Sequence, residues 1–235
     1  TKGIEERFQA VERLLELHPE WVGRFSFIQL AAPSRSIIEQ YRDYDARVRA
    51  LARRINDRFA QAAYPPIMVA IAHHAPSTVY EYYRAADLCF VSSLHDGMNL
   101  VAKEFVAARD DERSVLVLSR FTGAARELPE ALVVNPYDAD QCALALHLAL
   151  TMPDAEQRDR MQLMRGLVRE FSVYRWAGRM LVDATDLRRR ERLLARPGLS
   201  ACRNRRRRRR VRSGPISSIS TERCRSWPRP PTAHG

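Results

Sequence analysis

The sequence of 235 residues has no long apolar run and few cysteines. A membrane-spanning helix needs roughly 18 consecutive apolar residues, and no stretch of the chain approaches that length. The first residues also lack the basic-then-apolar pattern of a signal peptide. The four cysteines show no CxxC spacing, which argues against a metal site or a disulfide framework. They are Cys89, Cys142, Cys202 and Cys224. We therefore expect a cytoplasmic protein with no membrane partner and no bound metal.

Lysine is almost absent as well. The chain has 39 basic residues, of which only Lys2 and Lys103 are lysines, and its formal net charge is +11. A charge of this size would ordinarily indicate binding to nucleic acid or to an anionic membrane. However, residues 196–235 contain twelve arginines and a single acid, Glu222, and so carry the whole excess. Residues 1–195 are formally neutral, so the basic character belongs to the tail alone.

The tail is rich in arginine, proline and serine and has no sustained apolar period. Such a segment cannot bury enough surface to offset the entropy of ordering, so we expect it to be disordered. It could act as an arm for nucleic acid or a membrane surface, but charge blocks of this kind are usually solvated extensions. We favour that interpretation, with no specific nucleic-acid partner, and place the domain boundary between residues 195 and 196.

Residues 1–195 alternate between helical and extended patterns. Apolar residues at helical spacing predict helices over 5–17, 36–60, 78–86, 140–151 and 156–187. Short apolar runs predict strands over 25–31, 67–72, 88–92, 115–118 and 132–134. Strands that alternate with helices are typical of a doubly wound parallel sheet, which binds its ligands beyond the carboxyl ends of the strands. We therefore predict an α/β domain of this type.

The segment from Asp96 to Glu104 carries the clearest chemistry. It follows the strand expected over 88–92 and leads into a helix, so that unpaired N–H groups and the helix dipole face an anionic ligand. Gly97 would let the backbone approach that ligand closely. Asp96 on the loop and Glu104 about one turn into the helix could accept hydrogen bonds from hydroxyl groups of a ligand. A ligand that carries both phosphate and hydroxyl groups suggests a sugar nucleotide. A glycine-containing join of strand and helix is, however, also common in α/β folds that bind nothing there.

The same segment resembles the donor-site motif of the trehalose-6-phosphate synthases, which are retaining glycosyltransferases of the GT-B fold. Nine consecutive residues match, Asp96 to Glu104. Further resemblances follow in order along the chain. They are Thr1 to Phe8 with its Lys-Gly pair, Gln29 to Arg35, Ser119 to Leu128, and Asn135 to Asp138. The matching blocks cover about residues 1–185, and the chain is identified as the C-terminal, donor-binding Rossmann-like domain of this family.

The resemblance assigns roles to individual residues. Lys2 and Asp96 are expected to be catalytic: Lys2 meets the donor diphosphate, where a cation offsets charge on the departing nucleotide, and Asp96 contacts the transferred glucose. Glu104 holds the ribose hydroxyls, and Arg35 contacts the acceptor phosphate, for which a guanidinium is well shaped. The donor-binding set comprises Lys2, Asp96, Gly97, Met98, Asn99, Leu100, Val101, Ala102, Lys103 and Glu104.

The resemblance implies transfer of glucose from UDP-glucose to glucose 6-phosphate with retention, without a metal or other cofactor. The family's N-terminal Rossmann domain has no counterpart here, so we expect an incomplete copy that is inactive alone. It could form a homo-oligomer or pair with an intact synthase subunit. Three alternatives stay open: a catalytically silent nucleotide-sugar-binding or regulatory subunit, a glucosylglycerol-phosphate synthase, and, from the tail alone, a nucleic-acid-binding protein.

Removing residues 196–235 should separate the tail from the nucleotide-sugar site. We expect the shortened chain to bind UDP-glucose as the full chain does, because the donor motif lies in the neutral part. Binding to a polyanion such as heparin, which arginine charges make salt-dependent, should disappear. Calorimetry and a salt series on heparin resin measure the two effects, and loss of UDP-glucose binding on truncation would contradict the assignment.

Overall fold

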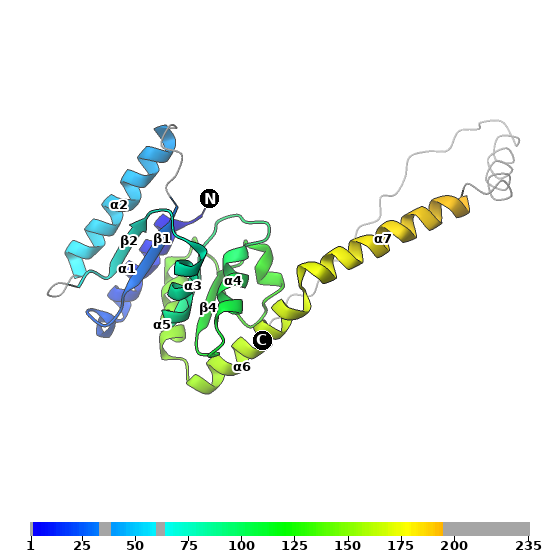
Figure 1. Ribbon diagram of the computed structural model, residues 1–235. Coiled ribbons are helices and arrows are strands. Elements are labelled where there is room, and N and C mark those ends of the chain that lie inside the picture. The colour runs from blue at the N-terminus through cyan, green and yellow to red at the C-terminus, as the bar shows by residue number, and fades with distance from the viewer. Residues whose placement is uncertain (1, 33–38, 60–63, 195–235) are drawn as a thin grey trace, which may run out of the picture. The chain divides into compact units, whose positions relative to one another are not determined.

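The computed structural model describes residues 2–32, 39–59 and 64–194, and the helices and strands alternate along the chain (Figure 1). The strands are β1 (Phe27–Ala31), β2 (Ile67–Ile71), β3 (Leu88–Val91), β4 (Val115–Ser119) and β5 (Leu132–Val134). The helices are α1 (Ile4–Leu17), α2 (Glu39–Phe59), α3 (Pro76–Ala85), α4 (Leu100–Ala108), α5 (Ala139–Thr151), α6 (Asp154–Glu170) and α7 (Val173–Leu194). Two short 3₁₀ helices, η1 (Pro19–Trp21) and η2 (Gly123–Arg126), complete the described part.

The expected helix over 156–187 is wrong as a single element. The chain leaves the helix at Phe171, and α7 begins two residues later. The hydroxyl of Ser172 accepts a hydrogen bond from the backbone N–H of Arg175, as an N-cap serine does when it starts a new helix. The apolar period continues across this break, which is why the sequence pattern alone suggested one helix. The other predicted elements agree with the structure to within a few residues.

All strand pairs are parallel, as predicted, but the ladders fall into two groups. β1 pairs with β2, while β3, β4 and β5 pair in that order. In the described residues no ladder of backbone hydrogen bonds joins β1 to β3. Side chains must therefore hold the two groups together.

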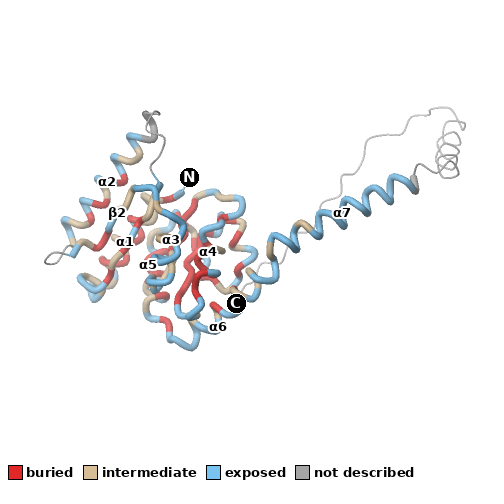
Figure 2. The backbone as a smooth tube through the Cα atoms, in the orientation of Figure 1, coloured by how far each residue is buried: buried red, intermediate tan, exposed pale blue. Residues whose placement is uncertain are grey.

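β4 shows that its sheet is covered on both faces. All five of its residues are buried, and Figure 2 shows the strand as a continuous buried stretch. Val115 and Val117 belong to one apolar cluster, whereas Leu116 and Leu118 belong to another. Because successive side chains of a strand point to opposite faces, each cluster lies on its own face. This is the doubly wound arrangement that the alternating pattern predicted.

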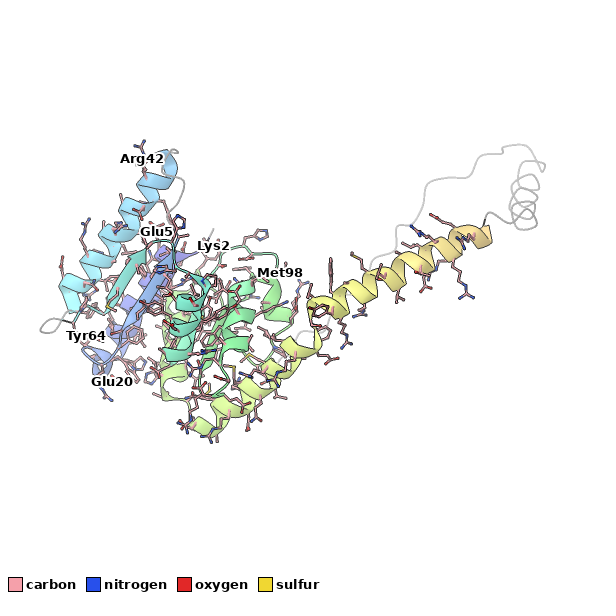
Figure 3. All side chains as sticks on the ribbon, in the orientation of Figure 1. Lys2, Glu5, Glu20, Arg42, Tyr64 and Met98 are labelled. Carbon is pink, nitrogen blue, oxygen red and sulfur yellow. The ribbon has the colours of Figure 1, made fainter. Side chains whose placement is uncertain are left out.

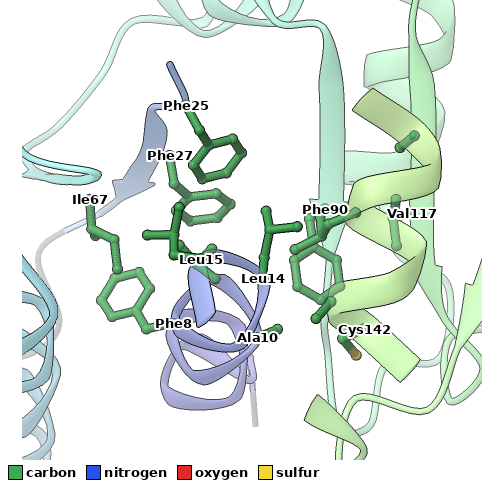
Figure 4. Packing of buried hydrophobic residues seen from close by; sticks show 14 of the residues in the cluster. Phe8, Ala10, Leu14, Leu15, Phe25, Phe27, Ile67, Phe90, Val117 and Cys142 are labelled. Carbon is green, nitrogen blue, oxygen red and sulfur yellow. The ribbon is translucent and has the colours of Figure 1, made fainter. Parts of the chain in front are cut away.

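α1 connects the two strand groups through the larger cluster. Its residues Phe8, Leu14 and Leu15 are fully buried, and they pack in one cluster with Phe27 of β1 and Phe90 of β3. Figure 4 shows the α1 side chains between these strands. A shared apolar core therefore takes over part of the role that backbone hydrogen bonds play within each ladder.

Arg7 of α1 adds a polar link between the same two groups. Its Nη1 donates to Oε1 of Gln29 on β1 at 2.7 Å, and its Nε donates to Oγ of Ser92, just after β3, at 3.0 Å. Both acceptors are buried, and the guanidinium lies over the ring of Phe90. Burial lowers the pKa of Arg7 from its usual high value, but an arginine still keeps its proton at neutral pH. One charged side chain thus satisfies polar groups from both ladders.

The chain divides into two compact units, residues 1–175 and 176–235. The first contains all five strands and every expected site residue. The boundary expected between residues 195 and 196 lies outside the described residues, and the assignment of 196–235 as a separate tail stays a prediction.

Replacing Arg7 with methionine should destabilise the first unit. The change keeps most of the side-chain volume but leaves the polar groups of Gln29 and Ser92 buried without their partner, which costs on the order of 2 kcal/mol. Urea unfolding followed by circular dichroism measures the difference. Arg47→Met is the matched control, because Arg47 contacts Glu5 in an exposed ion pair that contributes little. Equal stabilities for the two variants would show that Arg7 does not link the ladders.

Candidate functional site

The loop after β3 leads into α4, which is the strand–loop–helix join that the sequence predicted. Asn99 is the N-cap of α4, in the left-handed region at φ 61°, and its Oδ1 accepts from the N–H of Ala102 at 3.0 Å. The N–H groups of Leu100 and Val101 precede that bond, and first-turn groups have no partner inside their own helix. These two donors therefore have no partner within α4, and their contact with a ligand stays a prediction.

Asp96 organises the loop through both of its carboxylate oxygens. Its Oδ1 accepts from the backbone N–H of Asn99 at 3.1 Å and more weakly from that of Met98 at 3.4 Å. Its Oδ2 accepts from the side-chain amide of Asn99 at 3.3 Å. The aspartate thus sets the conformation of the turn that ends in the helix cap.

Lys2 meets Asp96 although 94 positions separate them in the sequence. The ammonium donates to Oδ2 of Asp96 at 3.1 Å; the lysine side chain is 71% exposed and the aspartate only 17%. Burial alone would raise the pKa of the Asp96 carboxyl. The hydrogen bond and charge of Lys2 and the N–H groups of Met98 and Asn99 outweigh burial and hold this pKa below its usual value. Asp96 is therefore ionised at neutral pH, beside a lysine that is still open to a ligand.

Lys2 owes its position to the residue that follows it. Gly3 caps α1 in the left-handed region at φ 66°, and a Cβ there would lie 2.0 Å from the carbonyl oxygen of Ser92. The Ser92 hydroxyl donates to the carbonyl oxygen of Gly3 at 2.6 Å. Only glycine fits this contact, which fixes the start of α1 against the end of β3. Figure 3 shows Lys2 and Met98 on the same side of the strands.

The loop after β4 makes backbone hydrogen bonds to the donor loop, residues 92–99 between β3 and α4. The N–H of Asp96 donates to the carbonyl oxygen of Phe121 at 3.2 Å, and the N–H of Gly123 donates to the carbonyl oxygen of Asp96 at 3.0 Å. A Cβ on Gly123 would lie 2.0 Å from the carbonyl oxygen of Gly97, whereas a Cβ on Gly97 would meet no atom within 4 Å. The close approach within the protein thus requires glycine at Gly123. At Gly97 the space is open toward a ligand.

The remaining predicted residues take different positions. Glu104 is half-buried on α4, one turn into the helix as expected, and Ala102 is buried beneath the helix start. Lys103 forms an ion pair with Glu127 beyond η2, so its charge is already engaged by the protein. Exposed apolar side chains surround the helix start, and they belong to Met98, Leu100 and Val101. Arg35 lies outside the described residues.

Sequence reasoning missed three residues that build this site: Arg7, Ser92 and Gly123. No motif near Arg7 or Ser92 indicates a contact across 85 positions of the chain. A signal existed for Gly123, because Thr122-Gly123 follows a strand end and opens a helical turn. Its role nevertheless depends on the neighbouring loop, which the sequence does not place.

A parallel α/β unit with a helix start beyond the carboxyl end of β3, next to a lysine–aspartate pair, has the architecture of a Rossmann-type domain. Residues 1–186 match glycosyltransferase family 20, and the chain belongs to that family.

Its relatives include trehalose-6-phosphate synthases. The trehalose-6-phosphate synthase of Klebsiella pneumoniae is 43% identical over 184 residues, which cover 78% of this chain and 39% of the relative. A UDP-forming α,α-trehalose-phosphate synthase of Burkholderia xenovorans, solved with glucose 6-phosphate, is 43% identical with a TM-score of 0.76; the match covers 78% of this chain and 40% of that one. The Escherichia coli structure with UDP-2-fluoro glucose is 40% identical with a TM-score of 0.76, covering 78% and 41% respectively. The chain thus spans about 40% of the length of these relatives.

Gly123→Ala and Gly97→Ala should have different effects on stability. The first adds a methyl group where a backbone oxygen lies 2.0 Å away, so the loop must shift and the protein should lose on the order of 1–3 kcal/mol. The second adds the same group in open space and should leave stability within about 0.5 kcal/mol. Chemical denaturation of the pair measures the contrast, and equal losses would contradict the contact between the two loops.

Proposed function

We propose that this chain is the donor-binding part of a trehalose-6-phosphate synthase, which transfers glucose from UDP-glucose to glucose 6-phosphate with retention of configuration. The observation that carries the proposal is the Lys2–Asp96 pair beside the free N–H groups at the start of α4. This arrangement offers a cation and N–H groups to the phosphates of a sugar diphosphate, and a carboxylate to its hydroxyl groups. The named relatives, a UDP-forming enzyme and structures with glucose 6-phosphate or a UDP-glucose analogue, support the same substrates.

The diphosphate would bind between Lys2 and the helix start. The exposed ammonium of Lys2 and the N–H groups of Leu100 and Val101 would offset the charge that accumulates on UDP as it leaves. We further propose that no metal is needed at this site, since these groups already supply positive potential to the leaving group. The catalytic contribution of the chain would then be charge stabilisation and positioning.

Two carboxylates would hold the sugar parts of the donor. Asp96 stays ionised in its pair with Lys2 and would accept hydrogen bonds from the hydroxyl groups of the transferred glucose. Gly97, Met98 and Asn99 would contact the same sugar. Glu104, one helical turn further, would accept from the ribose hydroxyls. Arg35 would contact the phosphate of the acceptor.

The matches cover about 40% of the length of the named relatives, so the transfer reaction of the whole enzyme is part of this proposal. We propose that the chain acts in the cytoplasm and pairs with an intact synthase subunit or with another copy of itself. The described residues include no helix long and apolar enough to cross a membrane. A silent nucleotide-sugar-binding subunit is the second candidate, because the groups described above suit binding of the donor whether or not transfer follows.

Glu104→Ala should weaken UDP-glucose binding at least tenfold, because one hydrogen-bonding carboxylate to the ribose is lost. Titration calorimetry of the full chain measures this loss. Glu81→Ala is the control, since Glu81 is an exposed acid on α3, and it should bind as the unchanged chain does. Absence of heat with the unchanged chain, or equal affinity in the Glu104 variant, would contradict the donor site.

An assay of UDP release with UDP-glucose and glucose 6-phosphate separates the two candidates once binding is established. A silent subunit should release no UDP beyond spontaneous hydrolysis and should leave the rate of an added intact synthase unchanged, whereas a donor-binding part that pairs with the synthase should raise that rate. Robust release by the chain alone would favour a complete enzyme over both forms of the proposal. Glycerol 3-phosphate as the acceptor tests the related glucosylglycerol-phosphate activity.

A further inference from the structure

Two histidines and a glutamate gather at the end of α1 that is farthest from Lys2. His18 ends α1, Glu20 lies in η1, and His147 comes from α5. The 14 residues of α1 span about 21 Å, and Figure 3 shows Lys2 and Glu20 at opposite ends of this helix. This cluster therefore has no part in the donor site.

The three side chains lie close together. The rings of His18 and His147 are stacked, with centroids 3.6 Å apart and planes 5° from parallel. Nδ1 of His18 lies 3.2 Å from Oε1 of Glu20. One ligand-type atom from each of the three residues lies within 4.8 Å of the others, and the two histidines are half-buried.

The hydrogen bonds of the cluster define which nitrogen is available. The indole N–H of Trp21 donates to Nδ1 of His147 at 3.1 Å, so this nitrogen carries a lone pair rather than a proton. On His18, the Nδ1 that faces the carboxylate of Glu20 can give up its proton to the other ring nitrogen. Two imidazole nitrogens and a carboxylate oxygen are thus available. An imidazole lone pair lies in the plane of its ring, so the two stacked rings must turn before both nitrogens can point at one position.

We propose that His18, Glu20 and His147 bind a divalent transition-metal ion of the zinc or nickel class. Imidazole nitrogen with one carboxylate is a donor set that suits these ions, whereas Mg²⁺ and Ca²⁺ prefer oxygen ligands. Nitrogen ligands at about 2.0–2.1 Å from zinc are roughly 3.4 Å apart, so atoms that now lie within 4.8 Å of one another must draw together by as much as about 1.4 Å. The ion takes the lone pair of His147 that Trp21 now contacts, and so the indole loses its acceptor on binding.

Such an ion would join α1 and η1 to α5. These elements meet at Trp21 and His147, and α1 and α5 both contribute to the larger apolar cluster. A ligand that binds only the folded form raises the unfolding temperature. The ion would therefore stabilise the packing of α1 without touching the donor loop.

Titration of the full chain with ZnCl₂ and NiCl₂, by calorimetry and by tryptophan fluorescence, tests the site. We expect one ion per cluster, a rise in unfolding temperature, and no effect of MgCl₂. Glu20→Gln, at an exposed position where misfolding is no concern, should weaken binding at least tenfold, and His18→Ala with His147→Ala should abolish it. Trp21→Phe should keep the heat of binding but lose the change in fluorescence.

His73→Ala is the matched control, because His73 is an exposed histidine outside the cluster. This variant should bind zinc as the unchanged chain does. Binding that survives the double histidine substitution, binding that His73→Ala removes instead, or no binding of either ion would each overturn the proposal.

Discussion

The buried guanidinium of Arg7 is the interaction on which the rest of the fold depends. The strands form two ladders with no backbone ladder between them in the described residues, and Arg7 supplies hydrogen bonds to both. Its Nη2 also approaches the carbonyl oxygen of Lys2 at 3.4 Å. The side chain that joins the ladders therefore also helps to hold the residue whose ammonium meets Asp96. The guanidinium of Arg7 thus makes hydrogen bonds both to the strands of the fold and to the segment that carries Lys2.

The site itself combines rigid backbone with one exposed charge. Asp96 is held by its own turn, by the loop after β4 and by Lys2, whereas the lysine side chain is mostly in solvent. An exposed ion pair contributes little to stability. The pair is better understood as preorganisation: it keeps the carboxylate ionised and leaves the ammonium near the position that a diphosphate would occupy.

Local pattern was enough to predict most elements and the join of loop and helix over residues 96–104. The apolar period gave the strands and most helices, and the residues Asp96 to Glu104 gave the loop and helix start, because each depends on neighbours in the sequence. The break at Ser172 was missed, since a single capping serine does not interrupt the apolar period. The contacts of Arg7 with Gln29 and Ser92, and of Gly123 with Gly97, were missed for a different reason. They join segments far apart in the chain, and their geometry exists only after the sheet has formed.

The support that the loop after β4 gives to Asp96 comes from its main chain. The carbonyl oxygen of Phe121 and the N–H of Gly123 make the bonds, and the side chains of Arg120 and Thr122 take no part in them. Arg120 is exposed, so its replacement would leave these bonds in place, whereas the buried Thr122 also donates from its hydroxyl to the carbonyl oxygen of Ser119 and helps to shape the loop. The charge at position 120, close to the Lys2–Asp96 pair in the chain's fold, can thus change while the main chain keeps Asp96 where it is.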